Sequence, residues 1–249
     1  MKKLNAILIT GALFLISQSS FADIVINGTR VIYPEKSKEV NVRLTNVGTR
    51  PLLVQSWLDK GEAQESPENI NVPFIINPPV SRIDAKKGQV LRISALKNDL
   101  PKDRESIFYL NVLEVPPKMK ADKKNGEDKA VQDSGNSRLQ LAFRTRIKFF
   151  WRPDSIAKMT PAEQLKKINW TLVNNGKGWA IKATNNTPYH FTFSQVRVGG
   201  QDAKAGMVAP LSSAEFPMNN NAKPTGSDVK FSWINDFGSD VESQSMLSR

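Results

Sequence analysis

Residues 139–148 read Leu-Gln-Leu-Ala-Phe-Arg-Thr-Arg-Ile-Lys, a stretch in which apolar side chains alternate with polar or small ones. A period of two is typical of a β-strand, in which successive side chains point to opposite faces. The predicted apolar face consists of Leu139, Leu141, Phe143 and Ile147. This is the clearest strand in the sequence, and it indicates a β-rich fold.

The segments on both sides carry the same kind of signal. Short apolar runs bounded by Asn, Gly, Asp or Pro predict strands separated by turns. These runs are residues 24–26, 40–44, 52–57, 74–76, 90–93, 107–115, 168–173, 179–183, 190–198 and 229–234. No long amphipathic helix is predicted, and only one or two helical turns are expected at residues 161–167. The sequence therefore predicts an all-β protein.

Two sandwich domains fit this pattern. Pro153 and the polar residues 154–158 separate the strands into two groups, which predicts a boundary between domains. We expect one domain over residues 23–153 and a second over residues 154–249. Domains of about 100 residues are an ordinary size for a single hydrophobic core.

The first 22 residues have the pattern of a secretory signal peptide. Lys2 and Lys3 precede an apolar run at residues 4–16, and Ser20-Phe21-Ala22 places small residues at a cleavage site. The run is shorter than the roughly 20 residues of a membrane-spanning helix. We therefore expect an exported protein whose mature chain begins near Asp23.

The composition excludes several classes of chemistry. Because the 249 residues include no cysteine, thiol nucleophiles, thiolate metal sites and disulfides are ruled out. The formal net charge of +11 predicts a surface that attracts polyanions. Acidic proteins or anionic membranes fit better than nucleic acid, because no basic helix or aromatic stacking motif is present. Residues 118–138 are rich in charge, which predicts a solvated loop.

A second long motif lies at residues 100–117, which read Leu-Pro-Lys-Asp-Arg-Glu-Ser-Ile-Phe-Tyr-Leu-Asn-Val-Leu-Glu-Val-Pro-Pro. This stretch closely resembles the signature of the PapD-like periplasmic chaperones of the chaperone–usher pathway. Further matching motifs lie at residues 28–34, 145–153, 186–190 and 234–238. The resemblance implies two immunoglobulin-like β-sandwich domains set at an angle, with a cleft between them.

The resemblance also implies a function in the assembly of pili, or fimbriae. Such a chaperone binds pilus subunits in the periplasm, completes them by donor-strand complementation and delivers them to an outer-membrane usher. It implies that Arg30 and Lys148 anchor the terminal carboxylate of a subunit. The side chains of the donated strand that would enter the subunit are Leu139, Leu141 and Phe143. No catalytic activity, cofactor or metal is implied.

Simpler interpretations stay open for these residues. Arg30 and Lys148 could be ordinary solvated charges, and the apolar face of residues 139–148 could belong to the protein's own core. Lys148 has the opposite parity to that face, which a β-bulge or a cleft on that side of the strand would explain. If the apolar face is exposed in the free protein, weak self-association is expected.

A second set of residues implied by the resemblance is a charged bridge between the domains, formed by Glu105, Arg152 and Asp236. The alternative is a surface ion pair worth about 0–1 kcal/mol. The segment at residues 118–138 is long for the short-loop branch of the family. The chain nevertheless resembles that branch more, because it lacks the cysteine pair and the extended N-terminus of long-loop relatives.

Two other classes of protein, enzymes and structural or adhesive β-sandwich proteins, fit the sequence less well than a chaperone. An enzyme is disfavoured because the only histidine, His190, has no nucleophile elbow, metal-ligand spacing or phosphate-binding glycine loop beside it. A pilus subunit or a lectin is also exported and rich in strands. A subunit would carry a donor segment at its own N-terminus, whereas the donor-like strand here is internal. The internal position favours a chaperone.

Overall fold

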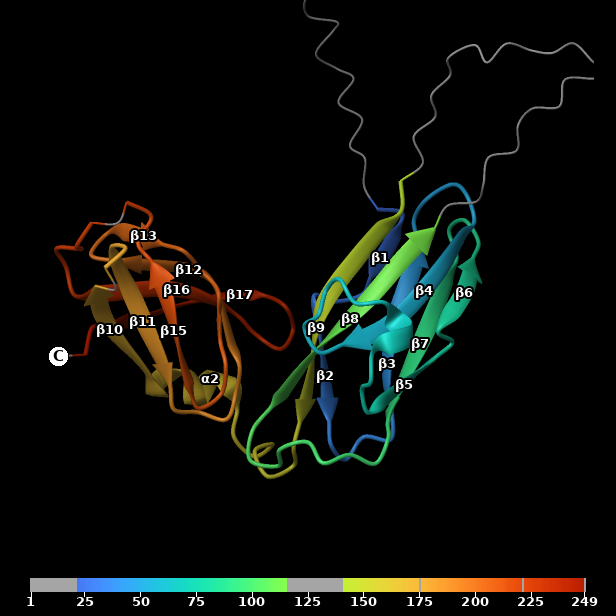
Figure 1. Ribbon diagram of the computed structural model, residues 1–249, viewed down its shortest axis with the longest axis horizontal. Helices are drawn as coiled ribbons and strands as arrows, with labels where there is room; N and C mark the ends of the chain where they lie inside the picture. Colours follow the sequence, from blue (N-terminus) through green and yellow to red (C-terminus); the bar gives the residue numbers. More distant parts are fainter. Residues whose placement is uncertain (1–21, 116–140, 175, 221, 249) are drawn as a thin grey trace, which may run out of the picture.

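The structure is a computed structural model, and it describes residues 22–115, 141–174, 176–220 and 222–248. The described strands form two lobes, one before and one after the segment that follows residue 152 (Figure 1). All of the predicted signal peptide except Ala22 lies outside the described residues, as does the charged segment at residues 118–138. Among the described residues, no helix has the length and apolar character that crossing a membrane requires.

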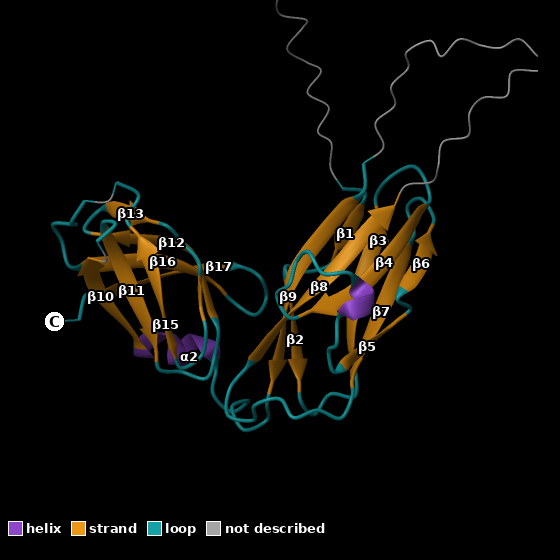
Figure 2. Cartoon of the chain, in the orientation of Figure 1, coloured by secondary structure: helices purple, strands orange, loops and turns teal. Residues whose placement is uncertain are grey.

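The N-terminal lobe is a sandwich of two sheets, whose strands are orange in Figure 2. One sheet has the order β1-β3-β7-β5, with bounds Ile24–Ile26, Val40–Asn46, Gly88–Ala95 and Phe74–Asn77. The other has the order β2-β9-β8-β4-β6, with bounds Arg30–Pro34, Phe143–Arg152, Ser106–Val115, Leu52–Asp59 and Val80–Ile83. A 3-10 helix, η2, covers Pro67–Asn69. All neighbouring strands are antiparallel except β2 and β9, which are parallel.

The C-terminal lobe is a second sandwich. One sheet has the order β10-β11-β15, with bounds Ile168–Asn174, Trp179–Asn185 and Ser212–Pro217. The other has the order β13-β12-β16-β17, with bounds Gln201–Ala203, Phe191–Val198, Asp228–Ile234 and Asp240–Met246, and β14, Met207–Val208, also pairs with β12. The helical turns expected at residues 161–167 are confirmed as α2, Pro161–Gln164, and η3, Leu165–Lys167.

Each lobe has its own hydrophobic core, and no residue belongs to both. In the N-terminal core, Tyr33 is fully buried and its ring centroid lies 5.3 Å from that of Trp151. In the C-terminal core, the ring centroid of Trp170 lies 5.0 Å from that of Phe193 and 5.1 Å from that of Phe231. The prediction of an all-β protein with two sandwiches is confirmed, whereas the boundary after Pro153 stays a prediction.

Some strands have no apolar alternation to predict them. Strand β17 reads DVESQSM and is mostly exposed, yet it pairs with β16 along its whole length, from Asp240 opposite Ile234 to Met246 opposite Asp228. Strand β15 likewise forms by pairing with β11. Backbone hydrogen bonds to a neighbouring strand, rather than side-chain burial, fix the extended conformation of these segments.

The strand predicted at residues 139–148 has different bounds, because β9 begins at Phe143 and continues to Arg152. Its first rung with β8 pairs Phe143 with Glu114, and β8 ends one residue later, at Val115. Leu141 and Ala142 precede the strand, and neither pairs with a strand of the described residues. Leu139 lies outside the described residues.

Candidate functional site

Two basic side chains lie next to each other where the two lobes meet. The parallel pairing of β2 with β9 puts Arg30 opposite Lys148. The Lys148 ammonium donates a hydrogen bond of 2.7 Å to the hydroxyl of Thr192, and the Arg30 guanidinium donates one of 2.8 Å to the carbonyl of Ile234. Both acceptors belong to the C-terminal lobe, so both cations lie at the junction between the lobes.

Acids lie near this pair without forming an ion pair with it, since the charges of Asp236, Glu105 and Asp240 act to raise the pKa of Arg30. Among the described residues, no carboxylate forms an ion pair with either Arg30 or Lys148. The Nε of Arg30 is buried without a hydrogen-bond partner. Burial, together with the neighbouring charge of Arg30, lowers the pKa of Lys148 to about 8, and burial also lowers the pKa of Arg30. Two desolvated like charges make this point of the surface receptive to an anion.

The parity of Lys148 is explained by the position of the junction. The register of β9 with β8 runs without a bulge from Phe143 to Trp151. Phe149 and Trp151 point into the N-terminal core, so Lys148 and Arg152 point to the opposite face. That face meets the C-terminal lobe. The register therefore excludes a bulge as the cause of this parity, and a cleft on this side of the strand stays a prediction.

The first half of β9 has an open edge. Strand β2 pairs only with residues 148–152, so residues 143–147 have β8 on one side and no strand of the described residues on the other. Phe143 is 37% exposed and Leu141 is 51% exposed, whereas Ile147 packs against the N-terminal core. The predicted apolar face is thus divided between an exposed part and a buried part.

On the opposite face of residues 143–147, a buried carboxylate binds the side chain of Arg146. Asp59 of β4 is 1% exposed, and its carboxylate accepts hydrogen bonds from Arg146 at 3.1 Å and from Asn111 at 2.6 Å. Burial alone would raise the pKa of Asp59, but these bonds outweigh it and hold that pKa below its usual value. The Arg146 guanidinium also lies 3.7 Å from the ring centroid of Tyr109. These contacts join residues that are far apart in the sequence, so no local sequence pattern predicts them.

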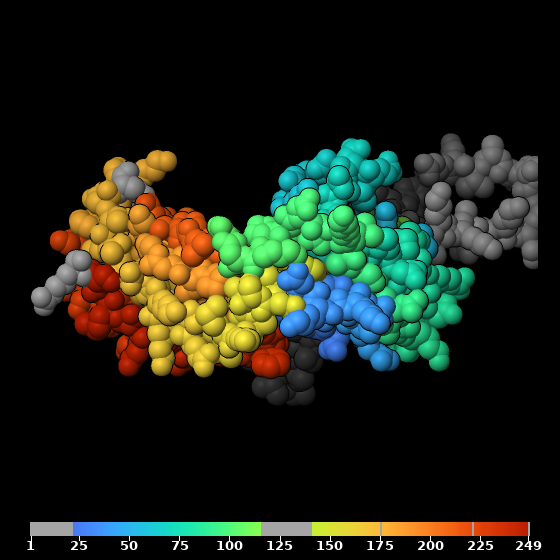
Figure 3. All heavy atoms as spheres, turned by 90° about the horizontal axis from the view of Figure 1, so that it is seen from below, coloured from blue at the N-terminus to red at the C-terminus, as the bar shows by residue number. Residues whose placement is uncertain are grey.

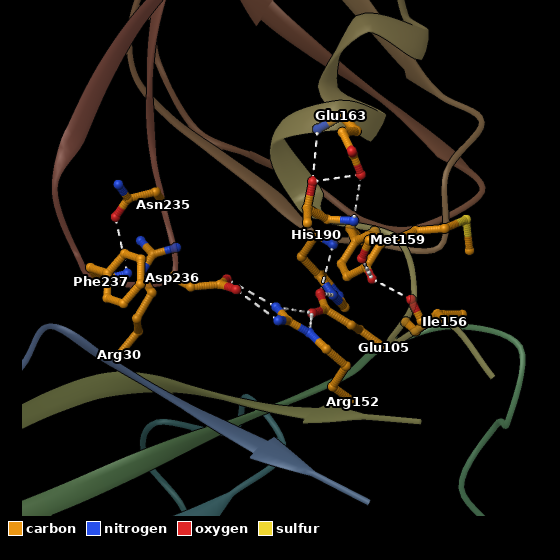
Figure 4. Close-up of polar contacts among 12 residues, drawn as sticks. Arg30, Glu105, Arg152, Ile156, Met159, Glu163, His190, Asn235, Asp236 and Phe237 are labelled. Carbon is orange, nitrogen blue, oxygen red and sulfur yellow. Dashed lines mark hydrogen bonds and ion pairs between the residues drawn. The ribbon is translucent and has the colours of Figure 1, made fainter. Parts of the chain in front are cut away.

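The three residues expected to form a charged bridge lie together (Figure 4). Arg152 donates two parallel hydrogen bonds to Asp236, of 2.7 and 2.9 Å, and one of 2.9 Å to Glu105. The Glu105 side chain is 2% exposed, that of Arg152 14% and that of Asp236 32%. Burial alone would lower the pKa of Arg152, but the hydrogen bonds and charges of both acids raise it above its ordinary value. This cluster is partly buried, unlike the surface ion pair considered as the alternative.

The only histidine belongs to the same junction. The backbone amide of His190 donates a hydrogen bond of 2.9 Å to Glu105, and its ring Nδ1 lies 3.3 Å from the same carboxylate oxygen. The Glu105 amide in turn donates to the carbonyl of Pro188 at 2.9 Å. In the space-filling view, the green segment near residue 100 lies against the C-terminal lobe (Figure 3). Within the part of the chain that is described, no cluster of His, Cys, Asp and Glu suits a metal ion.

A tight turn brings the β16–β17 hairpin against β2. Gly238 has a φ of +83°, and a Cβ at this position would overlap the hydroxyl of Thr29. Only glycine allows both the left-handed conformation and the close approach. Phe237 at the tip is 92% exposed. The hairpin thereby carries Ile234 and Asp236 to their partners on the N-terminal lobe, and Thr29 and Thr192 are contacts that sequence reasoning did not identify.

Two family models match this chain. Residues 23–157 match "Pili and flagellar-assembly chaperone, PapD N-terminal domain", and residues 163–245 match "Pili assembly chaperone PapD, C-terminal domain". The "Probable fimbrial chaperone YadV" of Escherichia coli K12 is 46% identical over 239 residues, which are 93% of this chain and 92% of that protein. The "Chaperone protein MrkB" of Klebsiella pneumoniae is 40% identical over 238 residues, which are 92% of this chain and 95% of that protein.

Solved structures are similar along almost the whole chain. The crystal structure of the YadV chaperone has a TM-score of 0.73 at 43% identity, and the match covers 91% of this chain and 100% of that one. A chain of the complex between the SafA pilin and the SafB chaperone of Salmonella enterica has a TM-score of 0.74 at 26% identity, with 92% and 98% covered. Since the models match both lobes and the relatives match nearly the whole length, this chain belongs to the PapD family of pilus-assembly chaperones.

Proposed function

We propose that this protein is a periplasmic chaperone that binds pilus subunits by donor-strand complementation and hands them to an outer-membrane usher. One observation carries the proposal. Arg30 and Lys148 form an unmatched pair of cations in line with the open edge of β9 at residues 143–147. An extended partner that ends in a carboxylate has the chemistry to satisfy both features at once.

The anchor is the pair of cations. The guanidinium of Arg30 has a geometry that suits two carboxylate oxygens, and the ammonium of Lys148 supplies a second charge beside it. Hydrogen bonds between charged groups contribute on the order of 1.5–3 kcal/mol each. Because the carboxylate lies at the end of a chain, holding it also fixes the register of the residues that precede it.

The donor is the edge of β9. The backbone N–H and C=O groups of residues 143–147 pair with a strand of the subunit, and exposed apolar side chains enter the groove that its missing strand leaves. The entering side chains are Leu139, Leu141 and Phe143. A slip of one residue would turn them away from the groove, so the anchor and the donor edge act together.

The charged cluster of Glu105, Arg152 and Asp236 fixes the angle between a domain at residues 23–153 and a domain at residues 154–249. A carboxylate held by an arginine across the junction favours one arrangement of the two lobes. A fixed angle keeps Arg30 and Lys148 at a constant distance from the C-terminal lobe. Both side chains are then in position before a subunit binds.

The site of action is the periplasm, and the signal peptide at residues 1–22 directs the export. Transfer to the usher requires that the subunit exchange the chaperone strand for the segment of another subunit. No cofactor or metal takes part in this exchange, because strand pairing and burial of apolar surface supply the free energy.

Co-purification of subunits tests the proposal. Tagged wild-type protein, Arg30→Ala and Lys148→Ala are produced in a periplasm together with candidate pilus subunits. We expect subunits to co-purify with the wild type and to be lost from both variants. Arg82→Ala is the matched control, because Arg82 is an exposed arginine of β6, the strand at the opposite edge of the sheet from β2. If both variants retained full binding while the wild type bound subunits, the anchor would have to lie elsewhere.

A further inference from the structure

A glutamate occupies a core position at the end of β8. Glu114 continues the inward row formed by Phe108, Leu110 and Val112, and it is 4% exposed. A carboxylate in such a position is unfavourable unless hydrogen bonds and an opposite charge compensate for its lost hydration. The groups that surround the Glu114 carboxylate therefore decide whether its lost hydration is compensated.

The compensation around Glu114 is incomplete. The amide of Ile24 donates to Oε2 at 2.8 Å, and the neighbouring Asp23 amide acts with it to lower the pKa of this carboxylate. Oε1 is buried without a hydrogen-bond partner, and no Lys, Arg or His of the described residues forms an ion pair with Glu114. Burial raises the pKa of Glu114, and the nearby carboxylate of Asp23 raises it further. One acceptor oxygen and one negative charge lack a partner.

The backbone nitrogen of Asp23 is the group whose chemistry changes when the expected signal peptide is removed. Hydrolysis of the Ala22–Asp23 bond by a signal peptidase adds the hydroxyl of a water molecule to the carbonyl carbon of Ala22 and a proton to this nitrogen. A further proton from solvent gives an α-ammonium with three N–H donors, where the peptide amide had one and no charge.

We propose that Glu114 is the binding site for the α-ammonium group of Asp23, which forms when residues 1–22 are removed. The ammonium forms at the backbone nitrogen of Asp23, next to Ile24 whose amide already donates to Oε2, and its additional N–H donors suit the unpaired Oε1. The new charge matches the buried carboxylate. Processing of the chain thereby completes the packing of β1, the first strand of the N-terminal domain.

The contacts around Asp23 hold its nitrogen in place. The carbonyl of Asp23 accepts a hydrogen bond of 2.8 Å from the amide of Val47, and the next residue, Ile24, is 5% exposed. A Cβ at Gly48 would overlap the carboxylate of Asp23, so that side chain packs closely against the turn. Figure 1 shows β1 and the end of β8 at the same end of the lobe. The carbonyl and the side chain of Asp23 therefore both hold this residue in place.

The test is a thermodynamic cycle on two mature chains. One chain begins at Asp23, and the other has a single glycine before Asp23, which makes the Asp23 nitrogen an amide again. Each is made with Glu114 and with Glu114→Gln. We expect the added glycine to lower Tm by on the order of 5 °C with Glu114 and by less than about 1 °C with Glu114→Gln. The control Glu39→Gln, at an exposed acid, keeps the full shift. Equal shifts in all three backgrounds would overturn the proposal.

A second readout does not depend on the folding of Glu114→Gln. In the chain that begins at Asp23, the α-amine should react with an acetylating reagent at pH 7.5 at least about tenfold more slowly than in urea, because an ion pair raises its pKa. Equal rates would overturn the proposal. Mass spectrometry of protein purified from a periplasm should identify Asp23 as the first residue, and a different first residue would also overturn it.

Discussion

Two basic clusters lie at the junction of the two lobes, and they differ in whether a carboxylate forms an ion pair with them. Arg152 donates hydrogen bonds to two carboxylates, Glu105 and Asp236. Within the described part of the chain, Arg30 and Lys148 donate to uncharged oxygens of the C-terminal lobe and form no ion pair with a carboxylate. Both clusters are partly buried at the same junction, so position alone does not separate them. The charge balance separates them. Ion pairs within the protein let the Arg152 cluster stabilise the fold, whereas Arg30 and Lys148 are stabilised most when an anion from another molecule binds to them.

The largest expected effect is on the matched cluster. Arg152→Ala should lower the free energy of unfolding by about 3–5 kcal/mol, since Glu105 would keep a buried charge without its partner. Urea denaturation of the purified protein measures the change. Adding Glu105→Gln to Arg152→Ala should restore part of the loss. A loss below about 1 kcal/mol would mean that the cluster behaves like a surface ion pair.

The unmatched cluster should respond in the opposite way. Lys148→Met keeps the length of the side chain but removes its charge, which is disfavoured by burial and by Arg30. We expect Tm to stay the same or rise, while the affinity for a subunit falls by roughly 10–100-fold. Calorimetry and subunit titration measure the two quantities. Lys230→Met, at an exposed lysine of β16, should change neither. If Lys148→Met destabilised the protein as much as Arg152→Ala does, the two clusters would not differ in their contribution to stability.

The pH dependence of stability and of subunit binding tests the role of Lys148 further. The folded-state pKa of Lys148, about 8, is below its ordinary value of 10.5, so the unfolded chain binds more protons between these values. In the free protein, this lysine therefore adds stability as pH rises from about 8 to 10.5. Binding of a carboxylate needs the charged form, so affinity should fall as pH rises above about 8. Lys148→Arg should bind without this fall, and an identical fall in that variant would assign it to another group.

The smallest expected effect on stability concerns the exposed part of the donor segment. Leu141→Ser should change the free energy of unfolding by less than about 0.5 kcal/mol, because the side chain is half exposed. It should weaken self-association of the free protein, which size-exclusion chromatography over a range of concentrations detects. Leu53→Ser, at a leucine that is 50% exposed, is the control. Strictly monomeric elution of the wild type at high concentration would contradict the expected self-association.

Much of the fold could be predicted because burial on one face of a strand leaves a period of two in the sequence. Apolar alternation identifies strands such as β3 and β8, whereas β17 is polar and exists only because β16 offers it a backbone edge. The bounds of β9 were mispredicted for a related reason. Alternation continues to residue 139, whereas the described pairing with β8 begins at Phe143.

The candidate site could be predicted only in part. Motifs gave the identities of Arg30, Lys148 and Arg152, but not their partners, which come from strands of the other lobe. The contact between Lys148 and Thr192 joins the two lobes, and so leaves no local pattern. Neither could the difference between a matched and an unmatched cation be read from the sequence, because it depends on which acids fold to within hydrogen-bonding distance.

The measurement that tests the central claim most directly compares two peptides with the sequence of the last residues of a pilus subunit. One peptide ends in a free carboxylate and the other in an amide, and isothermal titration calorimetry gives the affinity of each. The wild type should bind the free acid at least about tenfold more tightly, and Lys148→Met should lose most of this preference. Equal affinity of the wild type for both peptides would contradict the assignment of Arg30 and Lys148 as a carboxylate site.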